Sequence, residues 1–126
     1  MTHYKVCLLP GDGIGPEITS VTQNLLEVIS KKHNFKINFI EKLIGGSAIE
    51  KENSPLPDST LETCRKSDAV LMAAIGNPIY DTLPREKRPE TGLLALREGL
   101  NLFANIRPVK ISNSLIEASS LKPTII

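Results

Sequence analysis

The sequence predicts an α/β fold in which helices flank a parallel sheet. Short apolar strands alternate with amphipathic helical segments, the order typical of strand–helix–strand units. One expected strand, residues 69–75, is apolar at every position, which is typical of a strand covered by helices on both faces. With 126 residues, 40% of them hydrophobic and 23% charged, the chain has the length and composition of one globular domain.

The first predicted unit is a strand, a glycine loop and a helix. The apolar run Val6–Leu9 stops at Pro10 and Gly11, and Pro16 stands where the first turn of a helix tolerates a missing N–H. Apolar and polar residues then recur at helical spacing, which predicts an amphipathic helix. Its apolar side carries Ile18, Val21, Leu25, Val28 and Ile29, and its polar side carries Glu17, Ser20, Asn24 and Lys31.

The elements that follow continue the alternation. Residues 35–40 alternate apolar and polar side chains, which predicts a half-covered strand. Gly45 and Gly46 interrupt the chain, and a short helix carrying Leu61 and Cys64 follows the prolines at 55 and 57. A third helix is expected to begin near Glu90 or Gly92, and residues 102–109 are expected to form a further strand.

Composition argues against several classes of partner. The chain has 15 Lys and Arg against 14 Asp and Glu, so it lacks the basic excess of a nucleic-acid-binding protein. Cys7 and Cys64 are too few for a disulfide framework and lack the paired spacing of a zinc site. No apolar run approaches the roughly 18–20 residues of a membrane span. We therefore expect a cytoplasmic protein with neither a nucleic-acid nor a membrane partner, and no complete metal site.

The glycine loop has two interpretations. A loop between a strand and a helix presents N–H groups and the positive end of the helix dipole to an anion. However, glycines stand at 11, 13 and 15, so the sixth position of a G-x-G-x-x-G pattern is Pro16. The alternative is a tight structural turn, and the spacing favours that alternative.

A second candidate site lies on the helix expected around Arg97. At helical spacing Glu90, Leu93, Leu94 and Arg97 share one broad face. Arginine suits a bidentate hold on a carboxylate and leucines suit an aliphatic branch, so this face fits a small branched carboxylic acid. Arg107 lies in an apolar stretch and needs an anionic partner. The alternative for this face is an amphipathic helix whose charged ends are simply solvated. The alternative for Arg107 is a structural salt bridge to a nearby glutamate.

Taken together, the motifs resemble the isocitrate/isopropylmalate dehydrogenase family, in the family's order. They lie at residues 9–17, 45–49, 55–57, 72–78, 88–97 and 102–108. The stretch from Glu90 to Arg97 is most similar to the isopropylmalate branch, because isocitrate enzymes typically carry serine and asparagine in that region. Asn77 and Tyr80 depart from the glycine and tryptophan that the family often has there.

The resemblance implies the N-terminal part of that family's fold, a parallel-rich sheet flanked by helices that is not a Rossmann fold. It covers about a third of the family's usual length, so residues 1–126 are expected to be an incomplete fold. Residues 1–101 would belong to the first, cofactor-side domain, and residues 102–126 would begin the second. The complete protein is expected to be a homodimer.

The resemblance also implies a reaction, the NAD-dependent oxidative decarboxylation of 3-isopropylmalate in leucine biosynthesis. Arg97 and Arg107 would hold the carboxylate that leaves as carbon dioxide, Leu93 and Leu94 would contact the isopropyl group, and Glu90 would lie between substrate and nicotinamide. The nicotinamide side would comprise Ile14, Gly76, Asn77 and Pro78 together with Glu90. Catalytic side chains and the ligands of Mg²⁺ or Mn²⁺ would lie beyond Ile126, so the 126-residue chain by itself is expected to be inactive.

Two alternative functions remain open at this stage. The apolar C-terminal residues Pro123–Ile126 suggest a fold cut short, which fits a truncated, non-catalytic chain or a split-gene half that needs a partner. A related dehydrogenase acting on isocitrate or tartrate fits the glycine motif but not the leucine pair.

Overall fold

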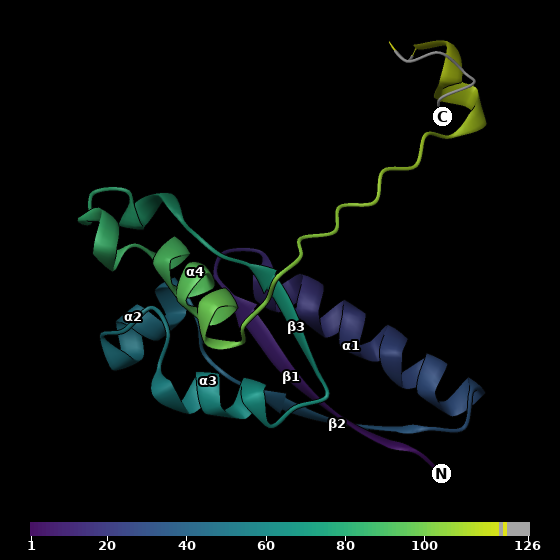
Figure 1. The fold of residues 1–126 in the computed structure, drawn as a ribbon, viewed down its shortest axis with the longest axis horizontal. Helices are drawn as coiled ribbons and strands as arrows, with labels where there is room; N and C mark the ends of the chain where they lie inside the picture. The colour runs from purple at the N-terminus through teal and green to yellow at the C-terminus, as the bar shows by residue number, and fades with distance from the viewer. Residues whose placement is uncertain (119, 121–126) are drawn as a thin grey trace.

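In a computed structural model, which describes residues 1–118 and 120, the chain forms a three-stranded parallel sheet in the order β2-β1-β3 (Figure 1). The strands are β1 (His3–Gly11), β2 (Lys36–Glu41) and β3 (Ala69–Ala74). The α-helices are α1 (Gly15–Lys32), α2 (Gly46–Glu52), α3 (Asp58–Arg65) and α4 (Pro89–Gly99). Of the 3-10 segments, η1 (Pro78–Tyr80) and η2 (Arg85–Lys87) lie between β3 and α4, and η3 (Asn113–Ala118) follows α4. The predicted α/β class with a parallel sheet is confirmed.

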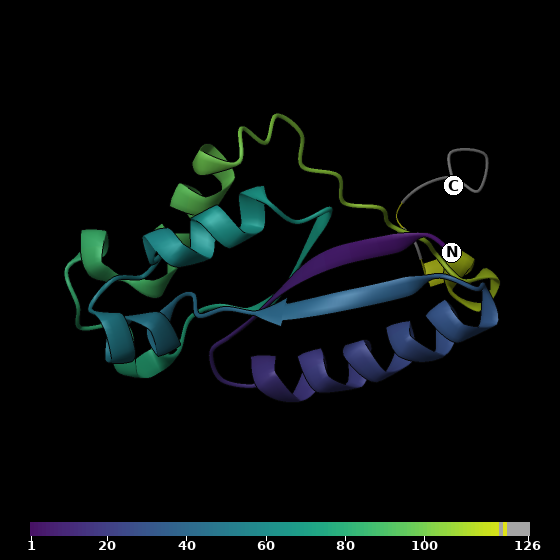
Figure 2. The same cartoon turned by 90° about the horizontal axis from the view of Figure 1, so that it is seen from below.

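The helices form a layer on each side of the sheet. Helix α1 connects β1 to β2 along one face, whereas α3 and α4 lie over the other (Figure 2). The chain passes from β1 to the neighbouring β2, and then from β2 across β1 to β3 on the other side. In such sheets, two neighbouring strands are followed by loops that lead to opposite faces of the sheet. Ligands usually bind between these two loops, at the carboxyl ends of the strands. The relevant loops here follow β1 and β3.

Strand β1 is longer than the apolar run predicted for it, because it is central. His3–Leu8 pair with β2, and Val6–Gly11 pair with β3. Its first three residues are exposed, so hydrogen bonding rather than side-chain burial defines this end of the strand. A pattern of apolar residues cannot detect such an extension.

The hydrophobic core lies between the sheet and the pair α3 and α4. Its buried members are Cys7, Leu9, Ile44, Cys64 and Leu96. The Cys64 thiol donates to the Cys7 sulfur at 3.6 Å, and both cysteines are free. Burial, with the neighbouring Cys64 adding to it, raises the pKa of Cys7 to about 12. These thiols therefore serve as packing groups and stay protonated at neutral pH.

Helix α1 has the predicted position but turns a different face to the sheet. Its buried residues are Gly15, Thr19 and Ser30, whereas the apolar residues Ile18, Val21, Leu25 and Val28 are exposed. Small residues let the helix lie close to the strands, and Leu8 is the buried side chain of β1 that alternates away from Cys7 and Leu9. The apolar pattern thus identified the helix without identifying its buried face.

Two further expectations are wrong. Helix α2 was not predicted, since Gly45 and Gly46 read as an interruption although Gly46 is its first residue. The strand expected at 102–109 does not form, and this segment runs away from the sheet with Phe103 wholly exposed (Figure 1). A strand needs a neighbour to satisfy its backbone, and no strand among the described residues lies beside it. The division into domains at residue 101 and the tail at 123–126 stay predictions, the latter outside the described residues.

Candidate functional site

The candidate site lies at the carboxyl end of the sheet. The loop after β1, the N-terminus of α2, the loop after β3 and the N-terminus of α4 meet there. The main-chain N–H of Asp12 donates to the carbonyl of Ala74 at 2.8 Å, which joins the two strand ends directly. The polar loops that carry the predicted motifs are therefore brought together by the parallel register itself.

Asp12 connects these loops through its side chain. One carboxylate oxygen accepts from the N–H groups of Gly46 at 2.8 Å and Gly76 at 2.9 Å, and the other accepts from Ser47 at 2.8 Å. The residue is only 5% exposed. Two of these donors open helix α2, where a carboxylate satisfies the free N–H groups of the first turn. Asp12 is thus the structural centre of the site, and the glycine loop around it is a turn.

Glu90 reaches the loop after β3 from the first turn of α4. Gly76 has a φ of +103°, and a Cβ at this position would lie 2.7 Å from the nearer carboxylate oxygen of Glu90. Only glycine adopts this backbone conformation readily, and a side chain at this position would displace the Glu90 carboxylate. The structure therefore brings together two residues that are 14 positions apart in sequence.

Local hydrogen bonds shape the loop between Gly76 and Glu90. The side-chain oxygen of Asn77 accepts from the N–H of Ile79 at 3.2 Å. The hydroxyl of Tyr80 donates to Glu50 of α2 at 2.6 Å, and this carboxylate raises the pKa of Tyr80 to about 12. Arg88 donates to the carbonyls of Leu83 and Asp81 at 3.0 and 2.7 Å. The loop is therefore folded on itself and attached to α2.

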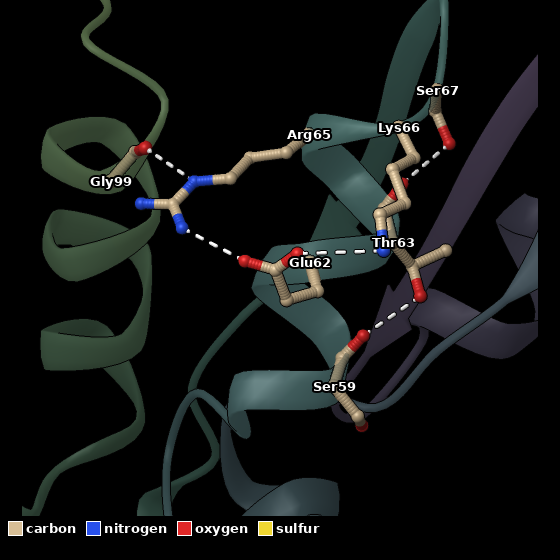
Figure 3. Close-up of polar contacts among 7 residues, drawn as sticks. All are labelled: Ser59, Glu62, Thr63, Arg65, Lys66, Ser67 and Gly99. Carbon is tan, nitrogen blue, oxygen red and sulfur yellow. Dashed lines mark hydrogen bonds and ion pairs between the residues drawn. The ribbon is translucent and has the colours of Figure 1, made fainter.

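Helix α4 is fixed at both ends. Near its start, a Cβ on Gly92 would lie 2.3 Å from the carbonyl oxygen of Pro55, so the helix backbone lies directly against the loop before α3. At its end, Arg65 of α3 donates to the carbonyl of Gly99 at 3.2 Å and pairs with Glu62 at 3.0 Å (Figure 3). Leu96 fills the core between these two anchors. The opposite face of α4 is consequently held in a defined position while remaining open.

That open face carries the predicted substrate residues. Leu93 is half-buried, Leu94 is 60% exposed, and Glu90 and Arg97 are exposed. Arg97 borders a shallow hollow of about 380 Å³ together with residues 102–106 of the chain that follows α4. Within residues 1–118 and 120, neither Arg97 nor Arg107 forms an ion pair, so the glutamate partner considered for Arg107 is not present there. Arg107 is exposed and lies just beyond the hollow rather than in it.

The remaining predicted residues lie in the loops after β1 and β3. Ile14 precedes α1 and is 66% exposed, and Asn77 and Pro78 follow Gly76 directly. The site thus has a buried, hydrogen-bonded carboxylate at its base, Asp12, an exposed carboxylate at Glu90 and two exposed arginines, Arg97 and Arg107. This arrangement suits a small anion with an apolar branch bound at the surface of α4.

The described part of the chain contains no group of side chains arranged to bind a metal ion. No group of three histidine, cysteine, aspartate or glutamate side chains is placed to hold an ion among those residues. Asp12, the one buried carboxylate at the site, already accepts three N–H hydrogen bonds. Also within that part, no helix has the length and apolar character needed to cross a membrane.

The sequence analysis assigned no role to Asp12. Gly46 and Ser47 offer free N–H groups at the start of a short helix and need an acceptor, but this signal can be interpreted only once α2 is known. Which of the aspartates supplies that acceptor depends on the fold, since Asp12 and Gly46 are 34 residues apart.

Comparison with known proteins assigns this arrangement to a family. The family described as isocitrate/isopropylmalate dehydrogenase matches residues 5–126. The 3-isopropylmalate dehydrogenase of Synechococcus sp. (strain CC9605) is 63% identical over all 126 residues, and that of Prochlorococcus marinus (strain NATL2A) is 65% identical over 122 residues. The chain spans 35% and 34% of the length of these two relatives.

Solved structures agree at the level of the fold. A β-decarboxylating dehydrogenase from Thermococcus kodakarensis, in its apo form, has a TM-score of 0.61 and 32% identity over 79% of this chain and 27% of that one. Isocitrate dehydrogenase from Methylococcus capsulatus has a TM-score of 0.60 and 28% identity, covering 79% of this chain and 26% of that one. This chain therefore belongs to the isocitrate/isopropylmalate dehydrogenase family.

Proposed function

We propose that this chain is the N-terminal part of an NAD-dependent 3-isopropylmalate dehydrogenase of leucine biosynthesis. The observation that carries the proposal is the set of eight relatives of that name, which are 57–65% identical over at least 97% of this chain. The open face of α4 supports the same conclusion, because its two leucines and its arginine match an aliphatic malate better than a tricarboxylic acid.

The substrate is proposed to lie along the outer face of α4. Arg97 and Arg107 hold the carboxylate that is lost as carbon dioxide, and Leu93 and Leu94 contact the isopropyl group. The absence of ion pairs for both arginines among the described residues supports this role, since their guanidinium groups remain available to an anion. The hollow beside Arg97 is shallow, and a pocket that excludes water requires further polypeptide on that side.

The cofactor side is proposed to comprise Ile14, Gly76, Asn77 and Pro78, with Glu90 between nicotinamide and substrate. The close approach of Glu90 to Gly76 supports the pairing of these motifs in one place. When bound, NAD accepts the hydride from the substrate and Mg²⁺ or Mn²⁺ polarises the substrate oxygens. The chain's own contribution is to orient the substrate by its carboxylate and its branch. The metal ligands are proposed to lie outside this chain.

The complete enzyme is proposed to act in the cytoplasm as a homodimer, as the family resemblance implies. The two buried free thiols are consistent with a reducing compartment. By itself the 126-residue chain is proposed to be inactive, because it supplies only one wall of the substrate site.

A chimera tests the proposal directly. This chain is joined to the part of the Synechococcus sp. CC9605 enzyme that follows the matched residues, and NADH formation from 3-isopropylmalate, NAD and Mg²⁺ is measured. We expect activity from the chimera and none from the 126-residue chain. We expect Arg97→Gln to lower kcat/KM by about a hundredfold or more, because it removes a bidentate, charge-assisted contact.

The matched control is Lys66→Gln, an exposed cation at the end of α3 that pairs with Glu62 at 3.6 Å. It should leave kcat/KM nearly unchanged. A folded chimera that oxidises isocitrate in preference to 3-isopropylmalate would contradict the proposed substrate, and an Arg97→Gln chimera with unchanged kcat/KM would contradict the proposed role of Arg97.

A further inference from the structure

The side chain of Tyr80 connects the loop after β3 to helix α2. Its hydroxyl donates to Oε1 of Glu50 at 2.6 Å. Its ring lies against the backbone of Gly46, because a Cβ on Gly46 would overlap the ring atoms Cε2 and Cζ and would lie 2.7 Å from the hydroxyl oxygen. Gly46 and Glu50 are four residues apart, so they lie on one face of the helix. Tyr80 is therefore held at two points along that face.

The first turn of α2, against which Tyr80 lies, is itself fixed to the base of the site. Gly46 is buried, and its N–H donates to Oδ2 of Asp12 at 2.8 Å. The same oxygen accepts from the N–H of Gly76 at 2.9 Å. The loop after β3 is thus attached twice, through the main chain of Gly76 and through the side chain of Tyr80, and residues 77–79 lie between the two attachments.

The residues between these attachments make mainly local contacts. Pro78 and Ile79 are exposed, Ile79 by 65%. The side-chain oxygen of Asn77 accepts from the N–H of Ile79 at 3.2 Å, and its carbonyl accepts from the N–H of Tyr80 at 2.9 Å. Hydrogen bonds within the turn determine its shape but not its place. The contacts of Tyr80 with α2 place the turn relative to the sheet.

We propose that Tyr80 is a positioning residue for the dinucleotide, which holds Asn77 and Pro78 in place on the nicotinamide side of the site by lying against Gly46 and bonding to Glu50. This inference rests on the proposed function, because that function assigns Asn77 and Pro78 to the cofactor. A loop that is already ordered loses less conformational entropy when a ligand binds. A loosened turn should therefore weaken binding of the cofactor and leave binding of the substrate at α4 unchanged.

Tyr80→Phe tests the inference in the chimera described above, because it removes the hydrogen bond and keeps the ring. Isothermal titration calorimetry measures the dissociation constant of NADH without turnover. We expect this constant to rise about three- to fivefold, the effect of losing one hydrogen bond near the surface. KM for NAD should rise by a similar factor, whereas kcat and KM for 3-isopropylmalate should change by less than about twofold.

Substitutions in α2 test the same hydrogen bond from its other end. Glu50→Ala removes the acceptor and should reproduce the effect of Tyr80→Phe, and the two together should add nothing further. Glu50→Gln keeps an acceptor oxygen, so it should bind NADH within about twofold of the unsubstituted chimera. Glu52→Ala is the matched control, since Glu52 is an exposed glutamate at the end of the same helix. It should leave NADH binding unchanged.

Amide hydrogen exchange over residues 77–83 reports the order of the turn without the cofactor. In the cofactor-free chimera, Tyr80→Phe and Glu50→Ala should exchange faster in this segment than the unsubstituted protein. The reason is that the main-chain hydrogen bonds donated by Tyr80, Asp81 and Leu83 open more often once the turn is no longer held. Exchange in β1 should stay the same.

Two results would overturn the inference. Unchanged exchange over residues 77–83 in both variants would show that Tyr80 does not hold the turn. Faster exchange with an unchanged dissociation constant for NADH would show that the turn does not position the cofactor. An unsubstituted chimera that binds no NADH would contradict the proposed function and, with it, this inference. Equal binding of NADH by the unsubstituted chimera and by Tyr80→Phe would contradict this inference alone.

Discussion

The base of the candidate site and its outer face differ in how far this chain completes them. At the base, Asp12 is buried and each of its carboxylate oxygens accepts from backbone N–H groups, which joins three loops. Along the outer face of α4, Leu94 and Arg97 are exposed, and Arg97 forms no ion pair with any of the described residues. The polar groups at the base of the site are therefore paired within this chain, whereas the side chains of its ligand-binding face remain exposed and unpaired among the described residues.

Physical chemistry accounts for this difference. Buried polar groups without partners cost free energy, so the groups at the base have to be paired within the folded chain. Exposed charges and single leucines on a surface cost little, so the face of α4 can remain open until a ligand or further polypeptide covers it. The comparison predicts that substitutions at the base lower stability and that substitutions on the face change function.

The largest effect is expected for Asp12→Ala. The substitution leaves three N–H groups without their acceptor, and we expect it to lower the free energy of unfolding by about 4 kcal/mol. Asp81→Ala, on the exposed loop, is the control and should change it by less than about 0.5 kcal/mol. Urea unfolding of the chimera followed by circular dichroism provides the measurement. Equal stability of the two variants would contradict the assignment of Asp12 as the centre of the base.

A smaller effect is expected for Gly76→Ala. The residue has a φ of +103°, and the new Cβ would lie 2.7 Å from Glu90, so we expect a loss of about 2 kcal/mol. Gly13→Ala is the matched control, since Gly13 has a φ of +55° with no atom within 4 Å of such a Cβ, and strain alone should cost about 1 kcal/mol.

The double variant Gly76→Ala with Glu90→Ala separates the two causes in the same unfolding experiment. It should recover part of the loss, because the clash with the carboxylate is removed while the backbone strain remains. If Glu90→Ala recovers nothing, the close approach of Glu90 to Gly76 does not contribute to the energetics of the site.

The smallest effect is expected for Tyr80→Phe, which removes the hydrogen bond to Glu50 at 2.6 Å. Because both partners are near the surface, the loss should be less than about 1 kcal/mol. The pKa of Tyr80 is raised in the folded protein from 10.0 to about 12, so its contribution is fully present below pH 10 and is lost as the pH rises through 12. The difference in unfolding free energy between the two proteins should therefore shrink over this range. A constant difference would show that ionisation of the phenol does not govern the bond.

The elements of the fold were mostly predictable, and the exceptions have physical causes. The helix at Pro89–Gly99 follows from helical periodicity and the strand at Ala69–Ala74 from a continuous apolar run, and both signals depend only on neighbouring residues. Helix α2 was missed because it has only seven residues and its first turn is stabilised by Asp12, 34 positions away from Gly46. The extended segment 102–109 has the composition of a buried strand, but composition cannot supply the neighbouring strand that it needs.

The sequence by itself determined the class of fold, the order of its main elements and the motifs from Glu90 to Arg97 that resemble one branch of the family. These depend on spacing along the chain, which local rules can interpret. Only the tertiary structure decided that Asp12 joins three loops, that Gly76 makes room for Glu90, and that α1 turns Thr19 rather than Val21 toward the sheet. Each of these depends on which distant segment packs against which face, and burial and hydrogen bonding across the sheet determine that choice.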